Sequence, residues 1–353
     1  MILVTGASGM VGSHLLDVFS EAELYRTDLH AADQIHALDC RNRDQVMEVI
    51  GRVRPHVVLH MGAETDVDRC ERDIDHAFRS NALATLNIAL ACQRFDVTLV
   101  YVSTAGVFDG KKPEPYTEFD LPNPVNVYAT SKLEGEKFVQ SFVPKHYIVR
   151  AGWMFGGKGK DKKFVGKIAS MCLESGAEIK AVDDKFGCPT YAVDLLAAVK
   201  TLIQSDFYGI YHLVNSGSCS RYDVAVEISR FLGKTGRVVP VCSANFPLSA
   251  PRPRSEASRP YKFELLGLGR MRTWREALVD YLTAWQAAAA IPASAVAGTA
   301  SALPPGNGAE LWKGDAVAAG GLDKGVFWNP GERRDELEAV KVTPIAPAAA
   351  AVV

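Results

Sequence analysis

Ile2-Leu3-Val4-Thr5-Gly6-Ala7-Ser8-Gly9-Met10-Val11-Gly12 decides the fold. A short apolar run leads into glycines at G-x-x-G-x-x-G spacing, and a helix is predicted over residues 10–19. Small residues permit a tight turn that lets the backbone approach a pyrophosphate, and a helix N-terminus presents unpaired N–H groups to its charge. The alternative is a tight strand–helix turn without a ligand, but this context favours a dinucleotide site. We assign cofactor binding to Gly6, Gly9, Met10, Val11 and Gly12.

Outward from this loop, short apolar runs alternate with helical periodicity. Runs that are apolar through most of their length indicate strands buried on both faces of a parallel sheet. Strands are predicted at Ile2–Val4, Leu24–Tyr25, Val57–His60, Thr98–Val102 and Tyr147–Val149. Helices are predicted from an Asn42 N-cap to Val53 and from about Ile74 to Arg94. We therefore expect an α/β protein with a doubly wound, parallel-sheet Rossmann fold.

The chain of 353 residues is predicted to have three parts. Residues 1–150 form the NAD(P)-binding Rossmann domain, and residues 151–286 form a smaller substrate-binding region and lid. The lid includes the Pro-rich segment Pro247–Pro260, whose Arg252 and Arg254 either bind nucleotide phosphates or lie in a solvated loop. Residues 287–353 are rich in Ala, Pro and Gly, which predicts a poorly ordered C-terminal extension rather than an accessory module.

The amino-acid composition limits the kinds of molecule that the protein is expected to bind. Lys and Arg (39) nearly balance Asp and Glu (41), which gives no reason to expect nucleic acid or an anionic membrane. No apolar run reaches the ~18–20 residues of a membrane span. The seven cysteines are scattered without C-x-x-C, as in a reduced, cytoplasmic protein. No metal site is expected, because His56 and His60 lie along a predicted strand and lack the Glu of H-E-x-x-H.

The choice of cofactor should be decided after the second strand. Asp28 lies about 20 residues past the glycine loop, where a carboxylate accepts from a ribose diol and repels a 2′-phosphate. NAD is therefore favoured over NADP, although Arg26 could instead hold that phosphate. Asp39 and Cys40 fall where such folds meet the adenine; a surface acid is an equally good interpretation of Asp39.

Tyr128 and Lys132 are four residues apart, on one face of a predicted helix. A phenol is a poor acid at neutral pH unless a nearby cation stabilises its phenolate, and Lys132 can supply that cation. Thr104 ends the strand Thr98–Val102, at the edge where parallel sheets bind ligands, and its hydroxyl can orient a substrate oxygen. The three residues predict proton donation during hydride transfer; the alternative for Tyr128 and Lys132 is an ordinary surface pair.

These motifs carry a resemblance to a known family. The chain resembles extended short-chain dehydrogenase/reductases, closest to the dTDP-4-dehydrorhamnose reductase branch of nucleotide-sugar 4-ketoreductases. The resemblance rests on Val4–Gly12, His60–Glu71, Asn81-Ala82, Ser103–Gly110, Pro115–Glu118, Asn126–Glu136, Phe186–Tyr191, Gly209–Asn215 and Trp274–Leu278.

The resemblance implies Thr104, Tyr128 and Lys132 as a catalytic triad, with a nucleotide sugar as substrate and a homodimer as one option for assembly. Gly62, Ala63 and Thr65 would line the cofactor site together with Tyr128 and Lys132, and Lys132 could also bond the nicotinamide ribose. Val67 and Trp153 would contact the sugar, with Thr104 and Tyr128 at its reacting carbonyl. An indole face suits the C–H face of a pyranose, although an ordinary core tryptophan is as good an interpretation of Trp153.

One departure concerns the residues after the catalytic threonine. Ala105-Gly106 stands where related dehydratases carry an Asp-Glu pair for elimination, which argues against dehydration. The reductase branch is expected to carry an acid and an aromatic there, so the substrate could be a different 4-keto sugar nucleotide. We therefore predict an NAD(P)H-dependent reductase of a nucleotide-linked 4-keto-6-deoxy sugar. The alternatives are a cofactor-binding regulatory subunit, like the methionine adenosyltransferase β subunit, and a nucleotide-sugar epimerase.

Overall fold

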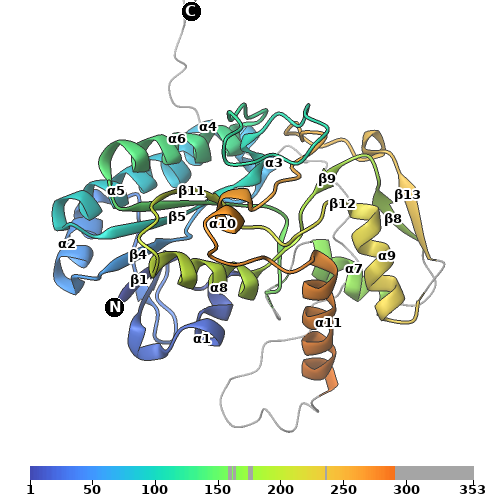
Figure 1. The fold of residues 1–353 in the computed structure, drawn as a ribbon, viewed down its shortest axis with the longest axis horizontal. Helices are drawn as coiled ribbons and strands as arrows, with labels where there is room; N and C mark the ends of the chain where they lie inside the picture. Colours follow the sequence, from blue (N-terminus) through green and yellow to red (C-terminus); the bar gives the residue numbers. More distant parts are fainter. Residues whose placement is uncertain (158–160, 162–163, 174–177, 235–236, 291–353) are drawn as a thin grey trace, which may run out of the picture. The chain divides into compact units, whose positions relative to one another are not determined.

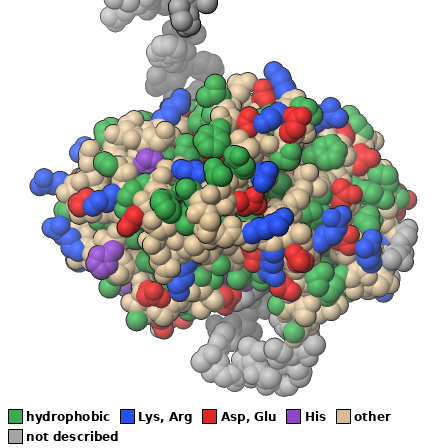
Figure 2. All heavy atoms as spheres, in the orientation of Figure 1, with side chains coloured by type: hydrophobic (Ala, Val, Ile, Leu, Met, Phe, Trp, Pro, Cys, Tyr) green, Lys and Arg blue, Asp and Glu red, His purple; other side chains and the backbone are tan. Residues whose placement is uncertain are grey.

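The structure is a computed structural model that describes residues 1–157, 161, 164–173, 178–234 and 237–290. All but the first four residues of the predicted extension 287–353 therefore lie outside the described residues. On the face drawn in Figure 2, basic, acidic and hydrophobic side chains are interspersed. Within the described ranges, no helix is both long and apolar enough to cross a membrane.

A seven-stranded parallel sheet lies at the centre (Figure 1). In spatial order its strands are β11 (Gly209–His212), β6 (His146–Ala151), β5 (Thr98–Thr104), β4 (Val57–His60), β1 (Ile2–Thr5), β2 (Leu24–Asp28) and β3 (His36–Ala37). The chain builds outward from β1 to β3, then reverses and builds from β4 to β11. Ligands of such sheets bind where the order reverses, beyond the carboxyl ends of β1 and β4. The predicted doubly wound fold is confirmed.

Helices cover both faces of the sheet (Figure 1). One face carries α2 (Arg43–Val53), α5 (Ala84–Phe95) and α6 (Val127–Phe142), and the other carries α1 (Leu15–Val18) and α8 (Ala192–Ile203). Alternation along a strand sends neighbouring side chains to opposite layers. Accordingly Ile2 and Val4 pack in the cluster that contains Leu195, whereas Leu3 packs in the cluster that contains Ile50.

Two predicted helices differ in detail from the structure. The helix expected from Ile74 to Arg94 consists of α4 (Ile74–Ala77), a π-helical segment Phe78–Leu83 and α5 in direct succession. The helix expected over residues 10–19 is a 3₁₀ turn at Gly12–His14 followed by the short α1, because the backbone of His14 leaves the helical conformation. The Asn42 N-cap is confirmed, since its side chain accepts from two backbone N–H groups of α2.

The chain after residue 150 contributes to two layers. The α8 helix and β11 return to the sheet, where β11 pairs with β6 as the seventh strand through a βαβ crossover. The other elements form or flank a second apolar cluster beside the sheet. They are α7 (Phe164–Leu173), β8 (Ile179–Val182), α9 (Arg221–Phe231), β13 (Val238–Val241), α11 (Trp274–Ala290) and the pairs β7 (Met154–Phe155) with β10 (Thr190–Tyr191) and β9 (Phe186–Gly187) with β12 (Cys219–Ser220). The short helix α10 (Tyr261–Leu265) instead packs against β11, and its Phe263 belongs to the apolar cluster of the sheet.

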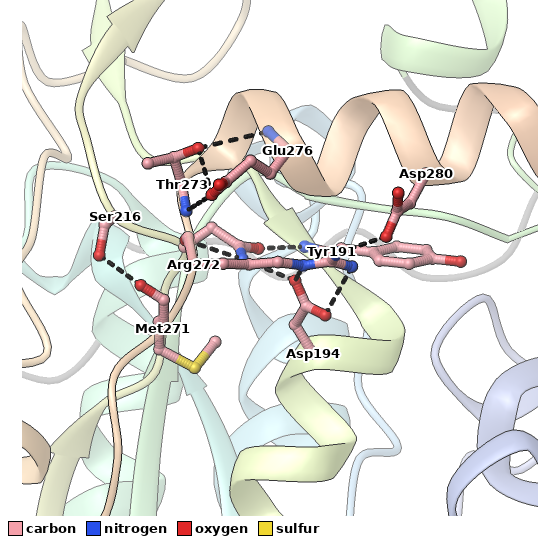
Figure 3. Close-up of polar contacts among 9 residues, drawn as sticks. Tyr191, Asp194, Ser216, Met271, Arg272, Thr273, Glu276 and Asp280 are labelled. Carbon is pink, nitrogen blue, oxygen red and sulfur yellow. Dashed lines mark hydrogen bonds and ion pairs between the residues drawn. The ribbon is translucent and has the colours of Figure 1, made fainter.

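Arg272 ties this second cluster to the sheet layer (Figure 3). Its guanidinium donates to both carboxylate oxygens of Asp194 on α8, over 2.8 and 2.9 Å, and it also pairs with Asp280 on α11. Asn215 joins the same group by donating to Asp194 over 2.7 Å. Bidentate guanidinium–carboxylate pairs fix orientation as well as distance. The arrangement therefore sets where α11 lies against α8.

Candidate active site

The glycine loop between β1 and α1 is packed too tightly for side chains at two positions. Gly6 has a φ of +74°, and a Cβ there would lie 2.8 Å from the backbone nitrogen of Gly62, in the loop after β4. A Cβ at Gly12 would lie 2.2 Å from the carbonyl oxygen of Ala7. Gly9 and Met10 are at least partly exposed, whereas Val11 is buried in the core and can offer a ligand only its backbone. The loop thus leaves its backbone free to approach a phosphate.

Asp28 lies at the end of β2, beside this loop. Its Oδ2 accepts hydrogen bonds from the backbone nitrogen (2.9 Å) and the hydroxyl (2.6 Å) of Ser8, and its Oδ1 accepts from the nitrogen of Leu29. Arg26 lies two residues before the carboxyl end of β2, and its guanidinium donates to Glu21 and Gln34. The group that faces the glycine loop is therefore the carboxylate and not the guanidinium.

Asp39 and Cys40 follow β3 at the same edge of the sheet. Asp39 accepts from the guanidinium of Arg41 at distances from 2.8 Å, and this hydrogen bonding holds its carboxyl pKa below the usual range. Burial raises the pKa of the Cys40 thiol to about 12, with the charges of Asp39 and Asp28 adding to the rise. The thiol is therefore neutral at physiological pH.

Gly62, Ala63 and Thr65 lie in the loop after β4, beside the glycine loop. Asn81, in the π-helical segment, holds this loop: its Oδ1 accepts from the nitrogen of Glu64 (2.8 Å), and its Nδ2 donates to the carbonyl of Glu64. The same Nδ2 donates to the hydroxyl of Ser131 on α6. Asn81 therefore couples the predicted cofactor loop to the helix of Tyr128 and Lys132, a role that the sequence did not reveal.

Thr104 ends β5 and lines one cavity with Tyr128, and Lys132 lies one turn after Tyr128 on α6. Burial raises the pKa of the Tyr128 phenol well above its usual value; hydrogen bonding with Thr104 opposes this rise and the charge of Glu256 adds to it. Burial lowers the pKa of Lys132 to about 7, against the opposing charge of Glu136. The Lys132 Nζ donates to the carbonyl of Val102 (2.8 Å) and lies 4.2 Å above the Tyr101 ring.

A buried ion pair connects the helix of Tyr128 and Lys132 to the sheet. Glu136, one turn after Lys132 on α6, binds Arg150 of β6 with a closest distance of 2.6 Å, and their side chains are 0% and 2% exposed. The other oxygen of Glu136 accepts from the hydroxyl of Ser103 over 2.5 Å. The pair joins α6 to β5 and β6 at the point where Thr104 and Lys132 are presented.

A cavity of about 620 Å³ opens over the carboxyl end of β5. Thr65, Val67, Thr104, Tyr128 and Trp153 all line it, so the structure brings the predicted substrate-contacting residues together. Its wall also carries three cations, Lys185, Arg221 and Arg252. Two of them are fixed: Lys185 donates to the carbonyl of Arg252, and Arg252 donates to Asp68.

Trp153 lines the cavity with its edge. The Arg221 guanidinium lies 3.7 Å above its ring, and a Cβ on Gly187 would lie 2.3 Å from Cε2 and 2.7 Å from Cδ2 and Cζ2, which places Gly187 directly over the ring. Two groups that both lie over one indole must occupy opposite faces. Neither face is therefore open to a pyranose, and the stacking expected from the sequence does not fit. Contact with a sugar would be through the ring edge.

A neutral buried phenol beside a hydroxyl, with a lysine one turn along the same helix and a glycine loop at the same edge of the sheet, can protonate a carbonyl during hydride transfer. With the doubly wound sheet, this arrangement defines a dinucleotide-dependent oxidoreductase of the short-chain dehydrogenase/reductase class. The family model described as the RmlD substrate binding domain matches residues 1–287. The chain belongs to this family, as the motifs predicted.

Similar proteins agree with this assignment. The chain is 35% identical to a dTDP-4-dehydrorhamnose reductase of Mycobacterium tuberculosis, over 80% of this chain and 92% of the relative. A solved dTDP-4-dehydrorhamnose reductase from Clostridium acetobutylicum superposes with a TM-score of 0.75 at 37% identity, covering 81% of this chain and 99% of that one. One from Bacillus anthracis in complex with NADP has a TM-score of 0.75 at 35% identity, covering 80% and 98%. These findings support NAD(P) as the cofactor.

Proposed function

We propose that the protein reduces the ketone of a nucleotide-linked 4-keto-6-deoxy sugar with NAD(P)H. The proposal rests on the composition of the cavity. Thr104 and Tyr128 line it, and so do the three cations Lys185, Arg221 and Arg252. A ketone can meet the hydroxyl pair while the diphosphate of the same substrate meets the cations. The names of the relatives support a reductase over the regulatory subunit and the epimerase.

The loops fit a dinucleotide, because Gly6 and Gly62 let the loops after β1 and β4 pack backbone against backbone at the edge of the sheet where such cofactors bind. When bound, NAD(P)H would supply the hydride that reduces the ketone to a secondary alcohol. Tyr128 gives the proton of its hydroxyl to the carbonyl oxygen, which Thr104 orients by a hydrogen bond. Lys132 stabilises the phenolate left behind until solvent reprotonates it. Gly9, Met10, Val11, Gly12, Ala63 and Thr65 complete the cofactor contacts, and Val67 contacts the sugar.

The test follows NADH and NADPH oxidation with dTDP-4-keto-6-deoxyglucose, dTDP-4-dehydrorhamnose and a few related keto sugars. We expect turnover with at least one of them and formation of the secondary alcohol, detected by mass spectrometry. Tight dinucleotide binding without any turnover would instead support a regulatory subunit. A purified protein that retains its cofactor and interconverts sugar epimers without net oxidation would support an epimerase.

Asp28 is expected to set the preference between the two dinucleotides. The substitution Asp28→Asn keeps an oxygen that can accept from Ser8 but removes the charge that repels a 2′-phosphate. We expect the ratio of kcat/KM for NADPH to kcat/KM for NADH to rise about tenfold, or ~1.4 kcal/mol, a modest share of a like-charge repulsion near a protein surface. Asp44→Asn, at the exposed start of α2, is the control. An unchanged ratio would remove Asp28 from cofactor selection.

A further inference from the structure

The Pro-rich segment Pro247–Pro260 brings one carboxylate to the cavity, that of Glu256. Within the described part of the chain, Glu256 is the only acidic residue that lines the cavity. Its position is fixed by the backbone: its nitrogen donates to the carbonyl of Phe186 on β9 over 2.8 Å, and the nitrogen of Phe186 donates to the carbonyl of Arg254. On the other side, the nitrogen of Tyr116 donates to the carbonyl of Ala257. Glu256 is thus held from both sides.

Its side chain lies beside the reacting groups. The Oε2 atom accepts from the Trp153 Nε1 over 2.9 Å. A Cβ built on Gly106 would lie 3.4 Å from the Oε1 atom of Glu256 and 3.3 Å from the Oγ1 atom of Thr104. A larger side chain at position 106 would therefore compete with Glu256 for this space. The small Ala105-Gly106 pair, which departs from the expected pattern, leaves room for a carboxylate from a distant loop.

Three cations and an indole N–H surround the carboxyl group of Glu256. Burial raises its carboxyl pKa, and the charges of Arg221, Arg252 and Lys185 together with the bond from Trp153 oppose that rise. Trp153 itself has a φ of +44°, a conformation that aromatic residues rarely adopt unless their surroundings impose it. In this conformation its Nε1 donates to Glu256, and Arg221 and Gly187 pack against its ring. The residues around the carboxylate are thus built to hold it in one place.

We propose that Glu256 accepts a hydrogen bond from the sugar hydroxyl on the carbon next to the reacting carbonyl, and so determines substrate specificity. The inference rests on the proposed function. If Thr104 binds the carbonyl oxygen, the neighbouring hydroxyl is the substrate group that can reach Oε1. An ionised carboxylate only accepts hydrogen bonds, so it selects a hydroxyl donor and disfavours a second ketone or an anion at that carbon.

The experiment compares two pairs of ligands. The first pair, dTDP-4-keto-6-deoxyglucose and its 3-deoxy analogue, is compared by kcat/KM. The second pair, dTDP-6-deoxyglucose and its 3-deoxy analogue, is compared by calorimetric Kd with NADP⁺ present. We expect the wild type to favour the 3-hydroxy ligand of each pair by about 10- to 100-fold, the range for a hydrogen bond to a charged group. Glu256→Ala should bring both ratios close to one, and Glu256→Gln should leave an intermediate ratio. Glu264→Gln, in α10 outside the cavity wall, is the matched control.

A second variant distinguishes recognition of the sugar hydroxyl by Glu256 from a purely structural role of Glu256. Trp153→Phe removes the N–H that holds Glu256 but leaves the carboxylate, so it should retain most of the discrimination while raising KM for both substrates. If Glu256→Ala retains the wild-type ratio, or if Trp153→Phe abolishes it as fully as Glu256→Ala does, Glu256 is only a structural residue and the inference is overturned. The protein could bind the 3-hydroxy ligand more tightly in a way that depends on Glu256 and yet show no turnover. That result would contradict the reductase proposal but support recognition by Glu256. Turnover without a preference for the 3-hydroxy ligands would support the reductase proposal and overturn recognition by Glu256.

Discussion

Replacing Tyr128 with phenylalanine should lower kcat for ketone reduction by about 100- to 10,000-fold, the range for a positioned general acid. Burial keeps the phenol protonated, so wild-type Tyr128 holds the proton that the carbonyl oxygen must receive. Phenylalanine preserves the ring and its packing, so the Kd for NADH should change little. The measurement is NADH oxidation under single-turnover conditions, which separates the chemical step from product release.

Tyr261→Phe is the matched control for this prediction. Tyr261 begins α10 and does not line the cavity, so the loss of its hydroxyl should leave kcat unchanged. If Tyr128→Phe retained wild-type kcat, another group would be the proton donor. If it lost cofactor binding together with kcat, Tyr128 would be acting through the cofactor site and not as an acid.

Glu136→Gln should lower the free energy of unfolding by about 3–5 kcal/mol, because it leaves the guanidinium of Arg150 buried without its counter-charge. Since domains are stable by only about 5–15 kcal/mol, this loss is a large part of the total. It should also impair reduction, because the charge of Glu136 raises the pKa of Lys132 and so favours the protonated lysine. Urea denaturation followed by circular dichroism measures the first effect, and NADH oxidation measures the second.

The same helix offers the control. Glu134 pairs with Lys137 on the exposed side of α6, with side chains 33% and 58% exposed, and exposed pairs contribute about 0–1 kcal/mol. Glu134→Gln should therefore be nearly neutral. The double variant Glu136→Leu with Arg150→Met should recover much of the stability, since it removes both charges together. A Glu136→Gln protein as stable as Glu134→Gln would show that Arg150 does not need its partner.

Much of the fold could be predicted from local sequence, because strand periodicity and glycine spacing are local signals. Neighbouring residues alone predict the strands at Ile2–Val4 and Val57–His60 and the Asn42 cap. The order of motifs along the chain predicts the site residues Thr104, Tyr128 and Lys132. Their meeting in one place follows from the rule that parallel strands present their carboxyl ends at one edge of the sheet.

What escaped prediction depends on contacts between distant segments. Glu256 is 128 positions after Tyr128, in a loop without periodicity, and it reaches the cavity through the backbone bonds that this loop makes with Phe186 and Tyr116. The covering of both Trp153 faces requires Arg221 and Gly187, which come from separate elements. Asn81 owes its role to the π-helical geometry around it. No local pattern indicates any of these contacts.

The π-helical segment Phe78–Leu83 has a consequence for how this protein can evolve. A π turn accommodates an extra residue at the expense of regular α-helical hydrogen bonding, and such turns are kept mostly where they are useful. Deleting one residue there would restore a regular helix but would turn Asn81 by about 100°, away from Glu64 and Ser131. Selection for heat resistance alone would therefore favour losing this turn, whereas selection for turnover would keep it.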